Sequence, residues 1–146
     1  MRIYQKALII ILSLGLLAAH QAVASESVVV IVNKDNQQEL TQQDVKNIYG
    51  DIVYQWKNGA RITVYNLPVN SQTREKFSEK IFGESAQRMA AEESNRKITN
   101  TINNPTITKR ARLVAKLVAK NPDAIGYIPV SVLDQEANVR VILRIE

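Results

Sequence analysis

The sequence predicts an α/β domain in which a mixed sheet is flanked by helices. Two runs, 27–32 and 124–128, are largely apolar and lack polar alternation, as is typical of strands that are covered on both faces. Between them lie segments, such as 109–120, whose apolar residues recur at helical spacing. Helices interleaved with buried strands favour an open α/β sandwich over a helix bundle or an all-β fold.

The first strand, 27–32, leads through turn formers into a helix with an N-terminal capping pattern. Thr41 can cap the first free amides of this helix, and Asp44 stands three residues further on. The pattern runs through Ile48, and Gly50 is suited to end it. We therefore expect a short amphipathic helix directly after the first strand.

A second strand is predicted at 61–65 from its alternating pattern. The following helix begins near Ser71 and carries Phe77 and Ile81 at i, i+4 spacing on one face. In the loop before the strand, we expect Trp56 to anchor that loop onto the core, because large aromatic residues are more often buried than exposed.

Ser85 can cap a further helix that extends to about Arg96, although its apolar stripe is thin. The segment 98–108 is polar, rich in Thr and Asn, and is predicted to be a long loop. A strong helical pattern returns at 109–120, and a last strand is predicted at 139–143. The outward stripe of that last helix is predicted to be a solvated face made of Arg112, Lys116 and Lys120. The predicted order is β-α-β-α-α-α-β-β.

The first residues form the three-part pattern of a secretory signal peptide. Two positive charges precede an apolar run at 7–19, and Ala22 and Ala24 supply the small residues of a cleavage site. The apolar run has 13 residues, whereas a membrane-spanning helix needs about 20. We therefore expect a signal peptide at 1–24 that is removed after Ala24.

Cleavage would leave a single domain at 25–146. It would lower the net charge from +5 to +3, because it removes Arg2 and Lys6 and no acidic residue. A domain of this length can bury a core without disulfides. The mild positive charge gives no reason to expect nucleic acid as a partner. The predicted product is a periplasmic protein that does not insert into the membrane after cleavage.

Cysteine and histidine usage excludes most familiar enzyme designs. The chain has no cysteine, and its one histidine, His20, lies within the predicted signal peptide. Without these side chains the mature domain cannot form a Ser-His-Asp triad, a Cys-His pair or an ordinary zinc site. We therefore predict a binding protein rather than an enzyme, with no metal and no cofactor.

The candidate functional site lies where the second strand leads into its following helix. The first amides of a helix lack intrahelical partners, and the helix dipole places partial positive charge there. The Ser71 and Thr73 hydroxyls and the Arg74 guanidinium add donors and charge, and Asn70 and Gln72 are their neighbours. Such a cradle suits a tetrahedral oxyanion such as phosphate or sulfate. The alternative is that Asn70 or Ser71 is an ordinary N-cap and Arg74 a solvated charge.

Several segments, taken in order, resemble the phosphate ABC-transporter substrate-binding protein family, and in particular its short, single-lobe members. They are Leu40-Thr41-Gln42-Gln43-Asp44-Val45-Lys46-Asn47-Ile48-Tyr49, Trp56 with Gly59, Ile62-Thr63-Val64, Ser71-Gln72-Thr73-Arg74-Glu75-Lys76-Phe77 and Asn121-Pro122-Asp123-Ala124-Ile125-Gly126-Tyr127. The resemblance covers the mature chain up to about Ile128. It implies a periplasmic-binding-protein type 2-like lobe in which Ser71, Thr73 and Arg74 contact an oxyanion, with no metal and no catalysis.

Three departures from the family pattern bear on that implication. Gln72 stands where the family has glycine, which keeps the backbone further from an anion. Gly50 lies one residue earlier, relative to Trp56, than the family glycine. The chain also lacks the segment that supplies phosphate donors from the first lobe in full-length members. A one-sided site leaves the anion hydrated, so we expect weak binding unless a partner or a second copy covers it.

The sequence thus predicts an exported protein that binds inorganic phosphate or a similar oxyanion, as the substrate-binding component of an ABC transporter does. Its expected protein partner is a membrane permease or another envelope protein. One alternative stays open, in which the same lobe is an interaction or assembly module of the cell envelope and its anion site is vestigial.

Overall fold

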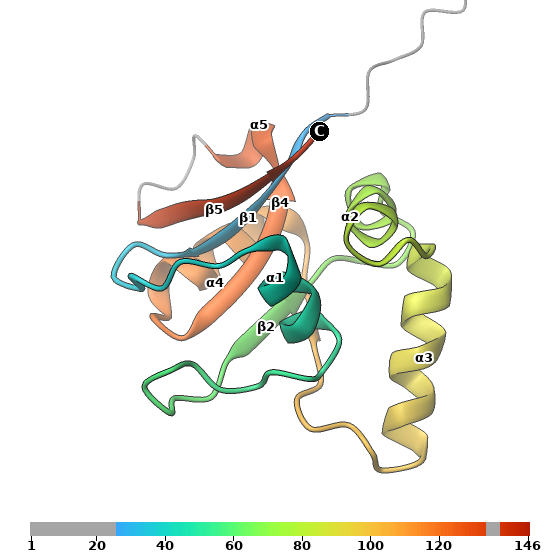
Figure 1. The fold of residues 1–146 in the computed structure, drawn as a ribbon. Coiled ribbons are helices and arrows are strands. Elements are labelled where there is room, and N and C mark those ends of the chain that lie inside the picture. Colours follow the sequence, from blue (N-terminus) through green and yellow to red (C-terminus); the bar gives the residue numbers. More distant parts are fainter. Residues whose placement is uncertain (1–25, 134–137) are drawn as a thin grey trace, which may run out of the picture.

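The computed structural model describes residues 26–133 and 138–146 of the chain and contains a single mixed sheet flanked by helices (Figure 1). The elements are β1 (Val28–Asn33), α1 (Gln42–Tyr49), β2 (Thr63–Asn66), α2 (Gln72–Phe82), α3 (Ala86–Ile98), β3 (Ile107–Thr108), α4 (Ala111–Lys120), β4 (Ala124–Pro129), α5 (Val130–Leu133) and β5 (Val139–Ile145). The predicted α/β class is confirmed. The predicted signal peptide at 1–24 lies outside the described residues.

The sheet has the strand order β3-β2-β4-β1-β5 and mixes both pairings. Strand β1 is antiparallel to β4 and β5, whereas β2 is parallel to β3 and β4. All six residues of β1 are buried, because this strand has a neighbour on each side and is covered on both faces. Coverage on both faces, which the sequence indicated, therefore explains why the apolar run of β1 is unbroken.

The two faces of the sheet are covered by different helices. Helix α4 packs on β4 and β1 from one side, and α1 and α2 lie on the other (Figure 1). Successive residues of β4 show this directly. Gly126 faces Val114 of α4, whereas the ring of Tyr127 contacts Tyr49 of α1 and Phe77 of α2. This division follows from the alternation of side chains along a strand.

The helix ends agree with the predicted caps. Thr41 and Asp44 form a complete capping box at the start of α1, and the backbone amide of Gly50 closes its last turn. Ser71 caps α2 through its hydroxyl, and Gly83 ends that helix in the left-handed conformation with φ 74°. Both α2 boundaries were therefore readable from local sequence.

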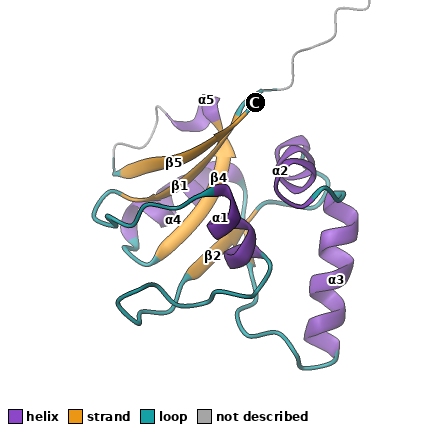
Figure 2. Cartoon of the chain, in the orientation of Figure 1, coloured by secondary structure: helices purple, strands orange, loops and turns teal. Residues whose placement is uncertain are grey.

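Helix α3 stands beside the sheet and packs mainly against α2 (Figure 2). It is 13 residues long, yet Ala86 is its single buried residue. Ser85 caps it as predicted, by accepting the amide of Arg88. The thin apolar stripe seen in the sequence thus corresponds to a helix held by few core contacts.

Some predicted boundaries are wrong. The segment 98–108, predicted as a continuous loop, contains β3 at its end, and α5 was not predicted. Both elements are too short to show a hydrophobic period, and β3 is exposed. Helix α4 begins two residues later than expected, after Arg110. Its predicted outward stripe is solvent-exposed, and its buried residues are Val114, Ala115 and Val118.

Trp56 anchors its loop, as expected. Its side chain is buried, and its indole nitrogen donates to the carbonyl oxygen of Asp123 at 3.0 Å. The same loop contains Asp51, which has a positive φ of 65° and is buried. The Asp51 carboxylate accepts the amides of Asn103 and Asn104, each at 2.7 Å. These bonds hold the long 98–108 segment against the domain.

Gly126 is required by the close approach of α4 to the sheet. A Cβ atom at this position would lie 2.5 Å from Cγ1 of Val114 and 3.2 Å from Cγ2 of Val118. The packed helix cannot move away without opening the core on that face. We expect Gly126→Ala to lower the free energy of unfolding by about 1–3 kcal/mol, measured by urea denaturation.

A double-mutant cycle with Val114→Ala tests the cause of that loss. Removing the clashing methyl groups should make the two changes less than additive, so that the double variant loses less stability than the two single variants together. Strictly additive losses would contradict the packing explanation.

Candidate functional site

The start of α2 presents polar groups at the protein surface. Ser71 and Thr73 are half-buried, whereas Asn70 and Gln72 are exposed. The Ser71 hydroxyl oxygen accepts the amide of Arg74 at 3.1 Å, so this residue is the N-cap. Its hydroxyl hydrogen is still available to a ligand. The surface groups therefore keep donors that an anion could use.

Arg74 has a different environment. The residue is only 5% exposed, and its Nη1 atom donates to the carbonyl oxygen of Leu67 at 2.8 Å. The interpretation of Arg74 as a solvated surface charge is therefore wrong. Its guanidinium turns beneath α2 into a small pocket whose lining residues do not include Ser71 or Thr73. The structure thus buries the positive charge, whereas the hydroxyls of Ser71 and Thr73 lie nearer the surface.

We call this cavity the α2–α3 pocket, since these two helices supply most of its walls. It is lined by Tyr49, Asn66, Arg74, Phe77, Ser78, Phe82, Met89, Glu93 and Arg96. Its volume is about 20 Å³, which is enough for about one water molecule.

Aromatic and amide groups hold Asn66 at the base of this pocket. Tyr127 stacks on Phe77 with ring centroids 3.8 Å apart, and its hydroxyl donates to Oδ1 of Asn66. Burial raises the pKa of the Tyr127 hydroxyl, and the nearby Arg74 charge opposes this shift only in part. Tyr127 therefore stays protonated at neutral pH and remains a donor.

Helix α3 contributes two charged residues that the predicted site did not contain. Arg96 and Glu93 line the pocket opposite Arg74. The Glu93 carboxylate accepts the amide and hydroxyl of Thr106 at 2.9 and 3.0 Å and pairs with Lys97 at 3.0 Å. The sequence signal for Glu93 and Arg96 was weak, because both are charged residues on a helix whose apolar stripe is thin.

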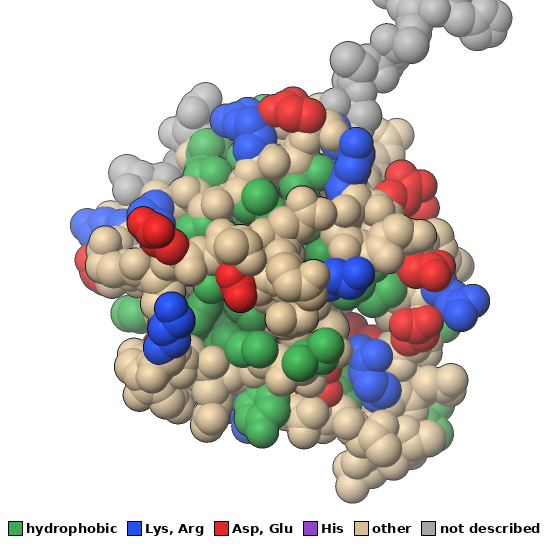
Figure 3. Space-filling view, in the orientation of Figure 1, with side chains coloured by type: hydrophobic (Ala, Val, Ile, Leu, Met, Phe, Trp, Pro, Cys, Tyr) green, Lys and Arg blue, Asp and Glu red, His purple; other side chains and the backbone are tan. Residues whose placement is uncertain are grey.

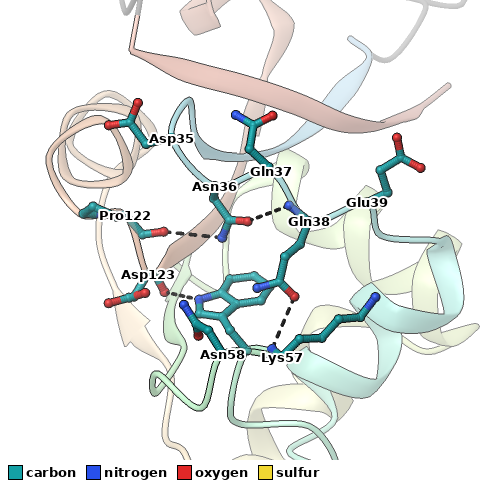
Figure 4. A pocket seen from close by; sticks show the side chains of 10 residues that line it. Asp35, Asn36, Gln37, Gln38, Glu39, Lys57, Asn58, Pro122 and Asp123 are labelled. Atoms are coloured by element: carbon teal, nitrogen blue, oxygen red, sulfur yellow. Dashed lines mark hydrogen bonds between the residues drawn. The ribbon is translucent and has the colours of Figure 1, made fainter.

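A larger depression of about 610 Å³ lies at the opposite end of the sheet (Figure 4). It is formed where the chain leaves β1 and where it enters β4, whereas α2 begins beyond the other end of the parallel strands. Its polar groups already bond to one another, as Asn36 does to the Pro122 carbonyl and Lys57 to Gln38. None of the predicted site residues reaches it.

Within 26–133 and 138–146 there is no group of three His, Asp or Glu side chains that could hold a metal ion. In the same part of the chain, none of the helices has the length and apolar character needed to cross a membrane.

A family model described as the PBP superfamily domain matches residues 14–141. The match spans most of the chain, and the mixed sheet with its flanking helices agrees with it. The chain therefore belongs to the PBP superfamily domain family, as its resemblance to phosphate transporter binding proteins indicated. No curated protein matches the chain.

Solved structures of phosphate-binding components share the fold. A structure from Clostridium perfringens, assigned to the phosphate ABC transporter substrate-binding proteins and solved with bound phosphate, has a TM-score of 0.61 at 24% identity, over 80% of this chain and 44% of that one. An ABC-type phosphate transport receptor from Vibrio cholerae has a TM-score of 0.60 at 20% identity, over 80% and 45%. PstS from Borrelia burgdorferi has a TM-score of 0.58 at 15% identity, over 80% and 46%. The chain thus spans less than half the length of the structures it matches.

The Tyr127 hydroxyl is predicted to stabilise the base of the pocket. Tyr127→Phe removes its bond to Asn66 and its weaker contact with the Leu67 amide at 3.4 Å. We expect a loss of about 0.5–1.5 kcal/mol in the free energy of unfolding, measured by urea denaturation. Tyr54→Phe is the matched control, because Tyr54 is partly exposed, and it should change stability by less than about 0.5 kcal/mol. Equal effects of the two variants would contradict this role.

Proposed function

We propose that this chain is an exported, periplasmic oxyanion-binding protein, related in role to the substrate-binding components of phosphate ABC transporters. The proposed ligand is inorganic phosphate or an anion of similar shape. It would bind at the start of α2, contacted by Ser71, Thr73 and the neighbouring Asn70 and Gln72, with the positive charge of Arg74 behind them. Catalysis is no part of this proposal.

The observation that carries the proposal is the placement of donors and positive charge around one helix start. The first amides of α2 lack intrahelical acceptors, and the hydroxyls of Ser71 and Thr73 lie beside them at the surface. Arg74 belongs to the same turn and is buried just below it. The helix dipole adds partial positive charge at this end.

The charge around the site is local rather than spread over the surface. Figure 3 shows Lys and Arg side chains interspersed with Asp and Glu side chains over the face that carries α1 to α3. Such a mixed surface gives little long-range attraction to polyanions. It therefore supports a small anion as ligand in preference to a nucleic acid.

The length of the chain bears on how the ligand would be held. The structures that it matches are longer than this chain, and the match covers only 44–46% of the three described above. We propose that a partner covers the anion, either a transporter permease, another envelope protein or a second copy. The same fact favours a second function, in which the lobe is an envelope interaction module with a vestigial anion site.

Thermal unfolding at constant ionic strength tests the first function. Phosphate or sulfate at 100 times its dissociation constant should stabilise the protein by about 2.7 kcal/mol over chloride. Thr73→Val removes one donor while keeping the side-chain shape, so it should reduce that gain. A melting temperature that does not respond to either anion, up to tens of millimolar, would exclude anion binding and leave the interaction module.

A pair of matched cap variants separates ligand contact from helix capping. Ser71 and Ser85 each accept a backbone amide at 3.1 Å at the start of a helix. Ser71→Ala and Ser85→Ala should both lower stability by about 1 kcal/mol without ligand. Only Ser71→Ala should also diminish the stabilisation by phosphate. If both variants keep the full gain, Ser71 does not contact the anion.

A further inference from the structure

We infer that the anion binds in the α2–α3 pocket, where Arg96 is a second cationic ligand beside Arg74. The Glu93 carboxylate in the same pocket opposes binding, because it repels the anion. This inference rests on the proposed oxyanion-binding function, shares Arg74 with the proposed site and places the anion in the pocket rather than at the Ser71 and Thr73 hydroxyls. Its basis is the charge balance and hydrogen bonding of the pocket.

The first observation is a buried cation without an ion pair. Arg74 is 5% exposed, and its recorded side-chain partner is the neutral carbonyl oxygen of Leu67. Among residues 26–133 and 138–146, no carboxylate lies within ion-pair distance of its guanidinium. Buried charges are normally paired, because desolvation is expensive. Arg74 is therefore a nearly buried cation whose charge no carboxylate of these residues neutralises by direct pairing.

The second observation is a buried donor without an acceptor. The Nε atom of Arg96 is buried and has no hydrogen-bond partner in the part of the chain that the structure describes. An unsatisfied buried donor costs about 1–3 kcal/mol, more when the group is charged. Arg96 lines the same pocket as Arg74, so two guanidinium groups border one small space, and the Arg96 guanidinium has an unpaired buried donor. Arginine is well suited to bind phosphate or carboxylate oxygens.

Glu93 supplies the negative charge that this pocket holds at present. Its side chain is only 12% exposed, and it lies on the pocket wall. Its oxygens bond to Thr106 and Lys97 instead of the two arginines. Glu93 thus lowers the net positive charge of the pocket without satisfying Arg74 or Arg96 directly. An entering oxyanion has to overcome repulsion from this carboxylate.

Space for the ligand requires a shift of α3. The pocket holds about one water molecule at 20 Å³, less than a tetrahedral anion needs. Helix α3 has one buried residue, Ala86 at its first turn, so its later turns carry few core contacts. Regions of this kind open at low free energy. The residues that line the pocket, Glu93 and Arg96, lie on those later turns.

Arg96→Gln is the test, because within residues 26–133 and 138–146 the Nε atom of the Arg96 side chain has no hydrogen bond for the variant to break. We expect dissociation constants for phosphate and sulfate, measured by isothermal titration calorimetry, to rise at least tenfold. Arg88→Gln is the matched control on the same helix, since Arg88 is exposed and pairs only with Glu92. The control should bind phosphate like the unchanged protein, and neither variant should lower the melting temperature without ligand.

Glu93→Gln tests whether the Glu93 carboxylate opposes anion binding. The amide keeps an acceptor oxygen for Thr106 but removes the negative charge, so phosphate and sulfate should bind severalfold more tightly. Glu92→Gln is its control, because the Glu92 carboxylate pairs with Arg88 outside the pocket.

The outcomes separate this inference from the proposed function. If the unchanged protein binds neither phosphate nor sulfate, the proposed function fails and the pocket assignment with it. If the unchanged protein binds phosphate and Arg96→Gln binds it equally well, anion binding stands and the pocket assignment is overturned. If Glu93→Gln binds phosphate and sulfate with unchanged affinity, the Glu93 carboxylate does not oppose anion binding.

Discussion

The close packing of β4 on both faces is the constraint on which the rest of this structure depends. On one face, Gly126 lets α4 approach the sheet so closely that position 126 has no room for a Cβ atom beside Val114 and Val118. On the other face, Tyr127 stacks on Phe77 and meets Tyr49 edge to face. A shift of β4 by one residue would exchange these two environments, and neither face could accept the other's side chain. The register of β4 against β1 and β2 is therefore fixed by sterics.

That register also determines where polar groups are placed. The Tyr127 hydroxyl reaches Asn66 at the end of β2, and the chain then turns through Leu67 into α2. Because Leu67 is followed closely by the helix start, its carbonyl oxygen is within reach of the Arg74 guanidinium. The buried arginine is thus a consequence of how β2 connects to α2, and its position beneath the helix start follows from the packing of β4.

Local sequence rules predicted the elements that have strong local signals. The capping box at Thr41, the cap at Ser71 and the buried run of β1 were all correct, because each depends on residues within a few positions of one another. The thin stripe of α3 was also correctly recognised as weak. The two-residue strand β3 was missed, because its pairing with Tyr65 and Asn66 depends on tertiary contacts. The same holds for α5, which is only four residues long.

The candidate site was predictable only in part, for a related reason. Spacing along the chain places Ser71, Thr73 and Arg74 on one helix turn, and the structure agrees. It cannot show whether a guanidinium points outward or inward, since this depends on a carbonyl partner and on the aromatic residues around it. Glu93 and Arg96 approach Arg74 across about twenty positions of sequence, through the packing of α3 on α2. A pattern of charges on a weakly apolar helix is usually a solvated face, so the pattern alone did not place Arg96 in the site.

The degree of enclosure determines how strongly these residues act on an anion. Low-dielectric surroundings strengthen an ion pair, whereas water on one side of a site weakens it. A charged site obtains such surroundings either from another protein or from the elements of its own chain. Helix α3 already covers Arg74 and adds a second arginine to the enclosed space. While no ligand is bound, the negative charge of Glu93 partly offsets the positive charges of Arg74 and Arg96. Enclosure of a positive site by the chain's own helix is therefore physically consistent with a domain that spans less than half of its structural neighbours.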